Sequence, residues 1–246
     1  MKRNNIIYEA LTQAGDKLIR EYCHRIVNYN AKHDIRLTNL FIPFVPNDYI
    51  NKRRIVVCTK VVCGRGHEFS IDGSTHFNPY VDAEMLIKLQ RKIKSNALDN
   101  IATASIVDRN IATLTRLAKD NSASLVHTNL VSIGYEYGNN GFDLDFNDQF
   151  AQYKRSEFKL LSPNLFIALT GPNYDFYFRR WIGNFDLMVC QEDIPVNQLT
   201  KMKFTDGVLA GVECYRTYSP GYYKYIGRSK IATKIKNFIN NLIINH

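Results

Sequence analysis

Polar and aromatic residues gather in four short stretches of this sequence, each at the end of a run of apolar residues. They read C-G-R-G-H-E-F at 63–69, H-T-N-L at 127–130, T-G-P-N-Y-D at 170–175 and T-Y-S-P-G-Y-Y-K-Y at 217–225. Carboxylates and imidazoles can transfer protons, an amide can donate and accept hydrogen bonds, and tyrosine rings can stack on flat ligands. Because loops that follow strands are enriched in functional residues, the four stretches are candidates for one site.

The elements that would position these stretches follow from the apolar patterns. Runs of apolar residues predict four buried strands, at 53–66, 124–134, 162–175 and 208–221. Apolar residues at helical spacing predict helices at 5–30, 82–95, 101–119, 174–181 and 229–246. Strands that alternate with helices predict an α/β fold, with a central, mainly parallel four-stranded sheet flanked by helices on both faces. Ligands bind at the carboxyl ends of such strands, so the four stretches would converge on one cleft.

Composition predicts a single folded domain over residues 1–246. We divide it into an N-terminal helical extension and connector (1–50), a core (51–228) and a C-terminal helix (229–246). Hydrophobic residues make up 45% of the chain, enough for a substantial core. Lys and Arg number 32 against 23 Asp and Glu, a formal charge of +9. This excess favours a polyanionic partner, nucleic acid above all, although it could also serve solubility alone.

The cysteines indicate a reduced, metal-free protein. They are odd in number and most lie in apolar runs, as is typical of core thiols: Cys23, Cys58, Cys63, Cys190 and Cys214. The closest pair lacks the C-x-x-C spacing of a zinc site, and we expect no metal or nucleotide cofactor. No stretch approaches the roughly 20 apolar residues of a membrane span, and the N-terminus lacks a signal-peptide pattern. We therefore expect a cytoplasmic protein without membrane contact.

The order of the segments resembles the uracil-DNA glycosylase superfamily, especially a poorly characterised branch. The shared features are a strand ending in G-x-E, a T-N-L strand, a T-G-P-N-Y-D turn and a T-Y-H-P-G-Y loop, spread over about 55–225 here. The stretches 162–175 and 215–222 are the most distinctive. The resemblance implies a glycosylase-like core and a monofunctional DNA glycosylase. Such an enzyme extrudes one nucleotide, holds its base in a pocket and lets water attack the sugar carbon, which leaves an abasic site.

In this family the first strand-end loop positions the attacking water with an acidic or amide side chain. Two positions after Gly64, where many members place that residue, this chain has Gly66. Glu68 is the best substitute, with His67 and Asp72 beside it, because a carboxylate can take a proton from water. The alternative for Glu68 is a solvated loop carboxylate.

The resemblance also implies residues that hold the base. Asn129 matches the family's base-reading asparagine, since an amide offers a donor and an acceptor to a base edge. It could instead satisfy backbone groups at a strand end. His127 would share the face of Asn129, either as a partner behind it or as a core histidine. Phe69 could stack on the base or plug its own loop.

The last loop departs from the family where Ser219 replaces a histidine that stabilises the departing base. A serine hydroxyl is a weaker donor, so Tyr218 or Arg216 could take over, a base that needs less help could be cleaved, or cleavage could be lost. Other residues implied at the DNA backbone or duplex are Gly171, Asn173, Arg216, Gly221, Tyr222, Tyr223, Lys224 and Arg228. Asn173 could also cap the following helix. A tyrosine-rich turn packed on the C-terminal helix is the alternative for this loop.

The sequence thus predicts a DNA glycosylase whose base is uracil in repair or a modified, phage-type base in defence against foreign DNA. Two alternatives stay open. One is a non-catalytic DNA-binding module that retains the fold, and the other is an enzyme that hydrolyses the N-glycosidic bond of free nucleosides or nucleotides.

Overall fold

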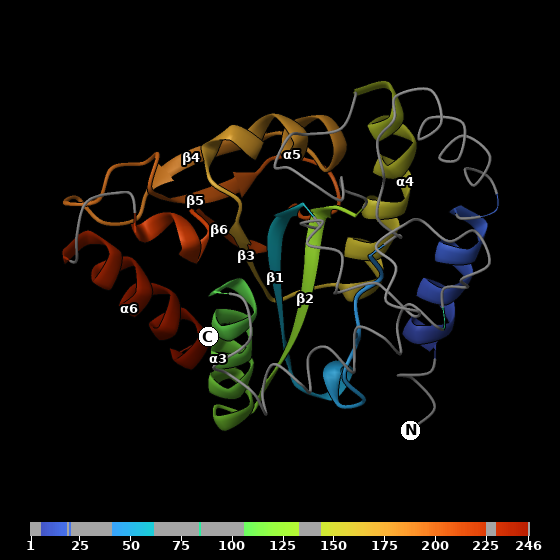
Figure 1. Ribbon diagram of the computed structural model, residues 1–246, viewed down its shortest axis with the longest axis horizontal. Helices are drawn as coiled ribbons and strands as arrows, with labels where there is room; N and C mark the ends of the chain where they lie inside the picture. Colours follow the sequence, from blue (N-terminus) through green and yellow to red (C-terminus); the bar gives the residue numbers. More distant parts are fainter. Residues whose placement is uncertain are drawn as a thin grey trace.

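Six strands form one sheet in the order β2-β1-β3-β6-β5-β4 (Figure 1). The structure, a computed structural model, describes residues 6–18, 20, 41–61, 84, 106–132, 144–224 and 230–245. The strands are β1 (Arg53–Val61), β2 (Ala123–Val131), β3 (Leu165–Leu169), β4 (Phe185–Val189), β5 (Leu199–Phe204) and β6 (Glu213–Thr217).

Four of these strands are the predicted ones, and they form the parallel part of the sheet. β1 pairs in parallel with β2 and β3, and β3 pairs in parallel with β6, whereas β5 runs antiparallel to both β6 and β4. The prediction of an α/β fold with a mainly parallel sheet is confirmed, but the prediction of four strands is wrong. The two additional strands were missed for different reasons: the short apolar run of edge strand β4, Leu187 to Val189, is exposed, and β5 places lysines between its apolar residues.

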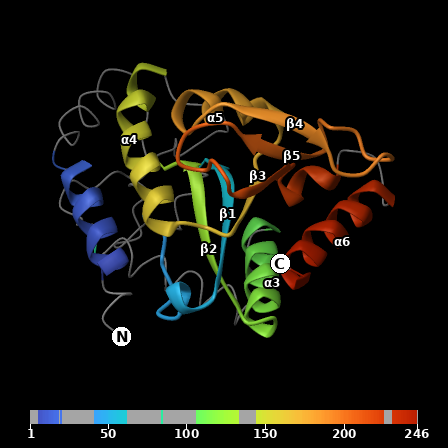
Figure 2. The same ribbon diagram turned by 180° about the vertical axis from the view of Figure 1, so that it is seen from behind.

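Helices cover both faces of the sheet. Alternate side chains of β1 point to opposite faces: Val56 and Cys58 pack with α4 (Leu144–Leu161), α5 (Asp175–Trp181) and the helical residues 6–18. Ile55 and Val57 pack with α3 (Ile106–Asp120) and α6 (Lys230–Asn245). The view from behind in Figure 2 shows α4 beside the N-terminal helix, away from α3 and α6. The predicted two-sided cover is confirmed.

Most predicted helices are present among the described residues. The helices expected at 101–119, 174–181 and 229–246 correspond to α3, α5 and α6, and residues 6–18 are helical as expected. The helix expected at 82–95 lies outside the described residues except for Glu84, which is helical. α4 was not expected, because Lys154 and Glu157 lie on its buried side and interrupt the apolar pattern.

The described part of residues 1–50 packs on the core. Ile7, Leu11 and Leu18 join the same apolar cluster as β1 and α4, and the backbone N–H of Phe41 donates to the carbonyl oxygen of Ser132, 2.7 Å away, just after β2. The division of the domain at residue 50 stays a prediction. Within the described ranges, no helix has the length and apolar character to cross a membrane. The described cysteines, Cys58, Cys190 and Cys214, are free thiols.

Candidate functional site

The carboxyl ends of the four parallel strands lie at one edge of the sheet. Thr59 at the end of β1 pairs with Asn129 of β2 on one side and with Leu169 of β3 on the other, and Leu169 pairs with Thr217 of β6. With a spacing of about 4.8 Å between neighbouring strands, β2 and β6 are about 14 Å apart at this level. Three of the four motif stretches therefore leave the sheet together.

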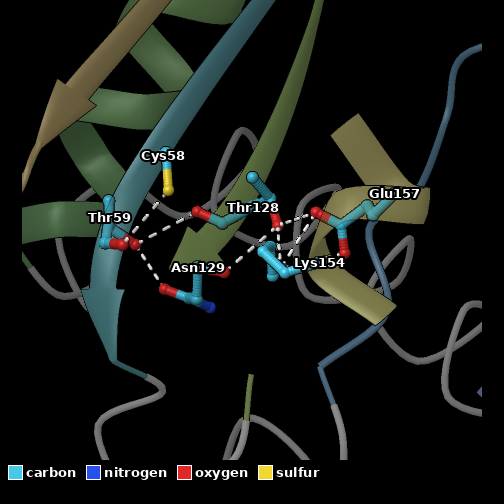
Figure 3. A network of polar contacts seen from close by, with 6 residues as sticks. All are labelled: Cys58, Thr59, Thr128, Asn129, Lys154 and Glu157. Carbon is cyan, nitrogen blue, oxygen red and sulfur yellow. Dashed lines mark hydrogen bonds and ion pairs between the residues drawn. The ribbon is translucent and has the colours of Figure 1, made fainter. Parts of the chain in front are cut away.

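Asn129 is buried at this edge and is held by side chains on the same face of the sheet. The hydroxyl of Thr59 donates a hydrogen bond to Oδ1 of Asn129. The same hydroxyl lies 3.0 Å from Nε2 of His127, two residues before Asn129 on β2. The expectation that His127 shares the face of Asn129 is confirmed, and Thr59 is the group that joins them. Figure 3 shows the amide nitrogen of Asn129 directed away from Thr59.

A buried ion pair lies on the opposite face of β2, directly behind this site (Figure 3). Nζ of Lys154 is 2.9 Å from Oε2 of Glu157, three residues later on α4, and both side chains are almost fully buried. The hydroxyl of Thr128 donates to Oε1 of Glu157 at 2.6 Å, and Lys154 donates to that hydroxyl at 3.2 Å. Thr128 precedes Asn129, so this network anchors the end of β2. Burial raises the pKa of the adjacent Cys58 thiol, which is therefore protonated and no nucleophile.

The turn after β3 touches the loop after β6. Gly171 has φ 76° and ψ 170°, a conformation reserved in practice for glycine, and its N–H donates to the carbonyl oxygen of Thr217 at 2.9 Å. Asn173 is exposed within the short 3-10 helix η2 (Pro172–Tyr174). No side-chain hydrogen bond caps η2 or α5, so the expectation that Asn173 caps the helix is wrong. Its exposed amide can still contact a ligand.

The loop after β6 presents a stacked pair of tyrosines. The rings of Tyr218 and Tyr222 lie 4.2 Å apart at 18°, and Tyr222 is 40% exposed. The N–H of Tyr222 donates to the carbonyl oxygen of Ser219 at 2.8 Å, at the start of the 3-10 helix η3 (Pro220–Lys224). Burial, with the neighbouring Tyr222 adding to it, raises the pKa of Tyr218, so its hydroxyl stays a neutral donor near pH 7.

Other expected members of this loop lie in the 3-10 helix η3 or beyond it. Gly221 lies in η3, half-buried, with open space where a Cβ would be. The backbones of Tyr223 and Lys224 lie in the same turn, while their side chains and all of Arg228 fall outside the described residues.

Arg216 is not placed to contact DNA. Its side chain is only 1% exposed, and its guanidinium donates to the carbonyl oxygen of Asn197 at 2.7 Å and to Oδ2 of Asp175 at 3.2 Å. Burial raises the pKa of Asp175, against the opposing effect of Arg216. Since Asp175 begins α5 and Arg216 belongs to β6, the pair fixes α5 against the sheet. We therefore leave Arg216 out of the interface.

A cation that we did not predict, Lys60, lies at the end of β1 against the aromatic residues that follow β3. Nζ of Lys60 is 5.7 Å from the ring centroid of Tyr174, whose ring packs on Tyr177, and Tyr177 packs on Trp181. Thr59 and Lys60 were also missed as members of the site. Their signal in the sequence is that two polar residues stand together inside an apolar strand.

The expected catalytic loop is not part of the described structure. His67, Glu68, Phe69 and Asp72 all lie between residues 62 and 83, outside the described ranges. Among described residues, the carboxylates near these strand ends include those of Glu157 and Asp175, which Lys154 and Arg216 already engage. No group of three His, Cys, Asp or Glu side chains in the described ranges could hold a metal ion.

No protein-family model matches this chain, and no curated protein matches it significantly. The uracil-DNA glycosylase resemblance therefore rests on the motif residues and on their order in the chain alone. The structure brings three of the four motif stretches together at one edge of the sheet. That arrangement offers a buried amide, a half-exposed pair of stacked rings and an exposed amide at one edge. Such groups can bind a flat, polar ligand such as a nucleobase.

Proposed function

We propose that this protein is a DNA glycosylase that extrudes one nucleotide from duplex DNA and hydrolyses its N-glycosidic bond. The observation that carries the proposal is the shared register of Thr59, Asn129, Leu169 and Thr217. It brings the T-N-L strand, the T-G-P-N-Y-D turn and the T-Y-S-P-G-Y loop to one edge of the sheet. Those are the stretches on which the family resemblance depends.

In this proposal, each residue is assigned a role according to the position of its side chain. Asn129 reads the edge of the extruded base, while the half-exposed ring of Tyr222 extends the stack of Tyr218 onto a base or a sugar. Asn173 and the backbone of the 220–224 turn contact phosphates. Tyr218 replaces the missing histidine near Ser219, because Arg216 is engaged inside the protein.

Hydrolysis breaks the bond between C1′ of the sugar and the base nitrogen. The base leaves with the bonding electron pair, and C1′ acquires oxocarbenium character before water adds to it. The carboxylate of Glu68 takes the proton that the water loses, and donors at the base stabilise its negative charge. The base is uracil or a modified base of the phage type.

Abasic-site formation on a panel of duplexes tests this proposal. The panel holds uracil, mismatched and phage-modified bases, and cleavage at abasic sites by alkali gives the rate. We expect Asn129→Ala to slow the reaction about 100-fold, as the loss of one fixed donor does, and Glu68→Gln to slow it at least as much. Asn237→Ala, on the exposed side of α6, is the matched control and keeps the wild-type rate.

Two results would contradict the proposal. Tight duplex binding without abasic sites on any substrate indicates a non-catalytic DNA-binding module. Rapid hydrolysis of free nucleosides or nucleotides without salt-sensitive duplex binding indicates an enzyme whose substrates are those small molecules and not DNA. If Asn129→Ala and Glu68→Gln both keep the wild-type rate, the enzyme acts through another site.

A further inference from the structure

We propose that β4 is the contact surface of a homodimer, in which the β4 strands of two copies pair in antiparallel fashion and join the two sheets into one. Among the described strands β4 is the last of the sheet and pairs only with β5 (Figure 2). Its other side is an edge along which a further strand can add by backbone hydrogen bonds. This inference goes beyond the proposed function, because it concerns strands that do not contribute to the candidate site.

β4 exposes apolar side chains at this edge. Leu187, Met188 and Val189 are 39%, 45% and 61% exposed. Edge strands commonly avoid pairing with other chains by means of lysines, prolines or a β-bulge. β4 contains neither lysine nor proline, and its register with β5 is regular along the whole strand, without a bulge. The strand is therefore suited to pairing with another chain.

The backbone groups of alternate β4 residues point away from β5. The N–H of Thr205 donates to the carbonyl oxygen of Asn184, 2.9 Å away, and the same register continues along β4. In an antiparallel pair, alternate residues form the hydrogen bonds to the neighbouring strand, so the even-numbered residues bond toward β5. The odd-numbered residues Phe185, Leu187 and Val189 thus present their N–H and C=O groups to the open edge.

A second copy of β4 is complementary to this edge. With a two-fold axis at Leu187, this residue faces Leu187 of the second copy, and Phe185 faces Val189 of the second copy. These residues have outward backbone groups, so hydrogen bonds form along the strand, and their apolar side chains lie together on one face of the joined sheet. On the other face Asp186 lies opposite Met188 of the second copy, so that no like charges meet.

Charges at the two ends of β4 favour the same arrangement. Arg179 is exposed, and its guanidinium lies 4.1 Å from the ring centroid of Phe185, at the start of β4. Glu192 is exposed in the turn that follows the end of β4. Antiparallel pairing brings the start of one β4 beside the end of the other, so each Arg179 approaches Glu192 of the second copy. This attraction offsets part of the repulsion between two chains that each carry a formal charge of +9.

The dimer leaves both candidate sites open. β4 runs in the same direction as β6, because β5 is antiparallel to both strands. The carboxyl end of β4 therefore lies at the same edge of the sheet as the candidate site. The two-fold axis reverses this edge in the second copy, so the two sites face opposite directions and bind separate ligands.

Sedimentation velocity from about 1 to about 100 µM protein tests the dimer, since small interfaces typically give micromolar dissociation constants. We expect wild type to pass from monomer to dimer over this range. Leu187→Lys stays monomeric, because two like charges then meet at the two-fold axis. Ile244→Lys adds the same charge at a residue of α6 that is 42% exposed, and this control dimerises like wild type. Val189→Lys carries the same comparison if Leu187→Lys does not fold.

An exchange of charges tests the antiparallel arrangement. We expect Glu192→Arg to weaken the dimer about fivefold, and the double variant Arg179→Glu, Glu192→Arg to return the dissociation constant to within about twofold of wild type. The homodimer is refuted if wild type stays monomeric at about 100 µM, or if folded Leu187→Lys dimerises as wild type does. A double variant that remains as weak as Glu192→Arg contradicts the antiparallel arrangement.

Discussion

Lys154 and Glu157 are charged side chains buried between α4 and the sheet, where they meet Thr128. Removing one partner leaves an uncompensated buried charge, so we expect Lys154→Met and Glu157→Leu each to lower the free energy of unfolding by about 3–5 kcal/mol. The double variant removes both charges together, so we expect it to lose less free energy of unfolding than either single variant. Urea denaturation measures all three, with Lys159→Met, exposed on the same helix, as the control that changes stability by less than about 0.5 kcal/mol.

The pair of Asp175 and Arg216 predicts a pH-dependent effect. Burial raises the pKa of Asp175 above its ordinary value of 3.8, and Arg216 opposes the shift. Without Arg216 the pKa rises further, so the folded state binds a proton more readily than the unfolded state, and stability falls as pH rises through that pKa. We expect Arg216→Met to lower the free energy of unfolding by about 3 kcal/mol at pH 7 and by clearly less at pH 4.5.

Urea denaturation of the Arg216→Met variant at the two pH values checks this prediction. Lys203→Met, which removes an exposed cation from β5, is the control for the change in net charge. An equal loss at both pH values would show that Asp175 does not depend on Arg216 for its charge.

Asn129 was predicted as a site residue because the H-T-N-L stretch resembles the family's base-reading strand, and the structure places it, buried, near the carboxyl end of β2. Thr59 could not be assigned a role in the same way, since its importance comes from a partner 70 residues away on the neighbouring strand. Arg216 was misassigned for a related reason. A cation beside a loop that is predicted to contact phosphates looks like a DNA contact in the sequence, and only the structure shows that the half-buried Asp175 engages it.

The turn after β3 and the loop after β6 act as one unit, and Gly171 joins them. A Cβ at this position would lie 2.8 Å from Cδ1 of Tyr218, in a backbone conformation that only glycine adopts readily. We expect Gly171→Ala to lower the free energy of unfolding by about 3 kcal/mol, measured by urea denaturation. Gly211→Ala is the control, because Gly211 has nearly the same φ of 77° and nothing lies near the position of its Cβ. We expect this variant to lower the free energy of unfolding by about 1 kcal/mol. Equal costs would mean that the contact with Tyr218 is unimportant.

β1, β2 and β3 were predictable because they are largely buried on both faces and contain apolar runs. β6 (Glu213–Thr217) was located only through the apolar residues 208–212, which lie in the turn before it. β4, β5 and α4 were not predicted, since β4 lies exposed at the sheet edge and α4 buries two charged side chains. The apolar pattern of the sequence identifies a helix or strand when burial alone determines which of its residues are apolar. The pattern fails where charged side chains are buried as ion pairs, as in α4, or where a strand at the sheet edge is exposed to solvent, as in β4.

The whole molecule carries a formal charge of +9, which predicts salt-dependent binding to duplex DNA. Cations that neutralise phosphates release counterions, so affinity falls steeply as salt rises. We expect the dissociation constant for an unmodified duplex to rise at least about 100-fold between 50 and 200 mM salt. Fluorescence anisotropy with a labelled duplex measures it, and an affinity that does not change with salt would argue that the positive charge serves solubility alone.

The release of a free base from DNA tests the central claim most directly. Wild-type protein is incubated with uracil-containing DNA and with DNA of several phages, and mass spectrometry identifies the bases set free while a chemical probe counts abasic sites. We predict that one kind of base is released in equal number to the abasic sites formed, and that Asn129→Ala abolishes most of this release. Tight, salt-sensitive binding to every DNA without any released base would contradict the account.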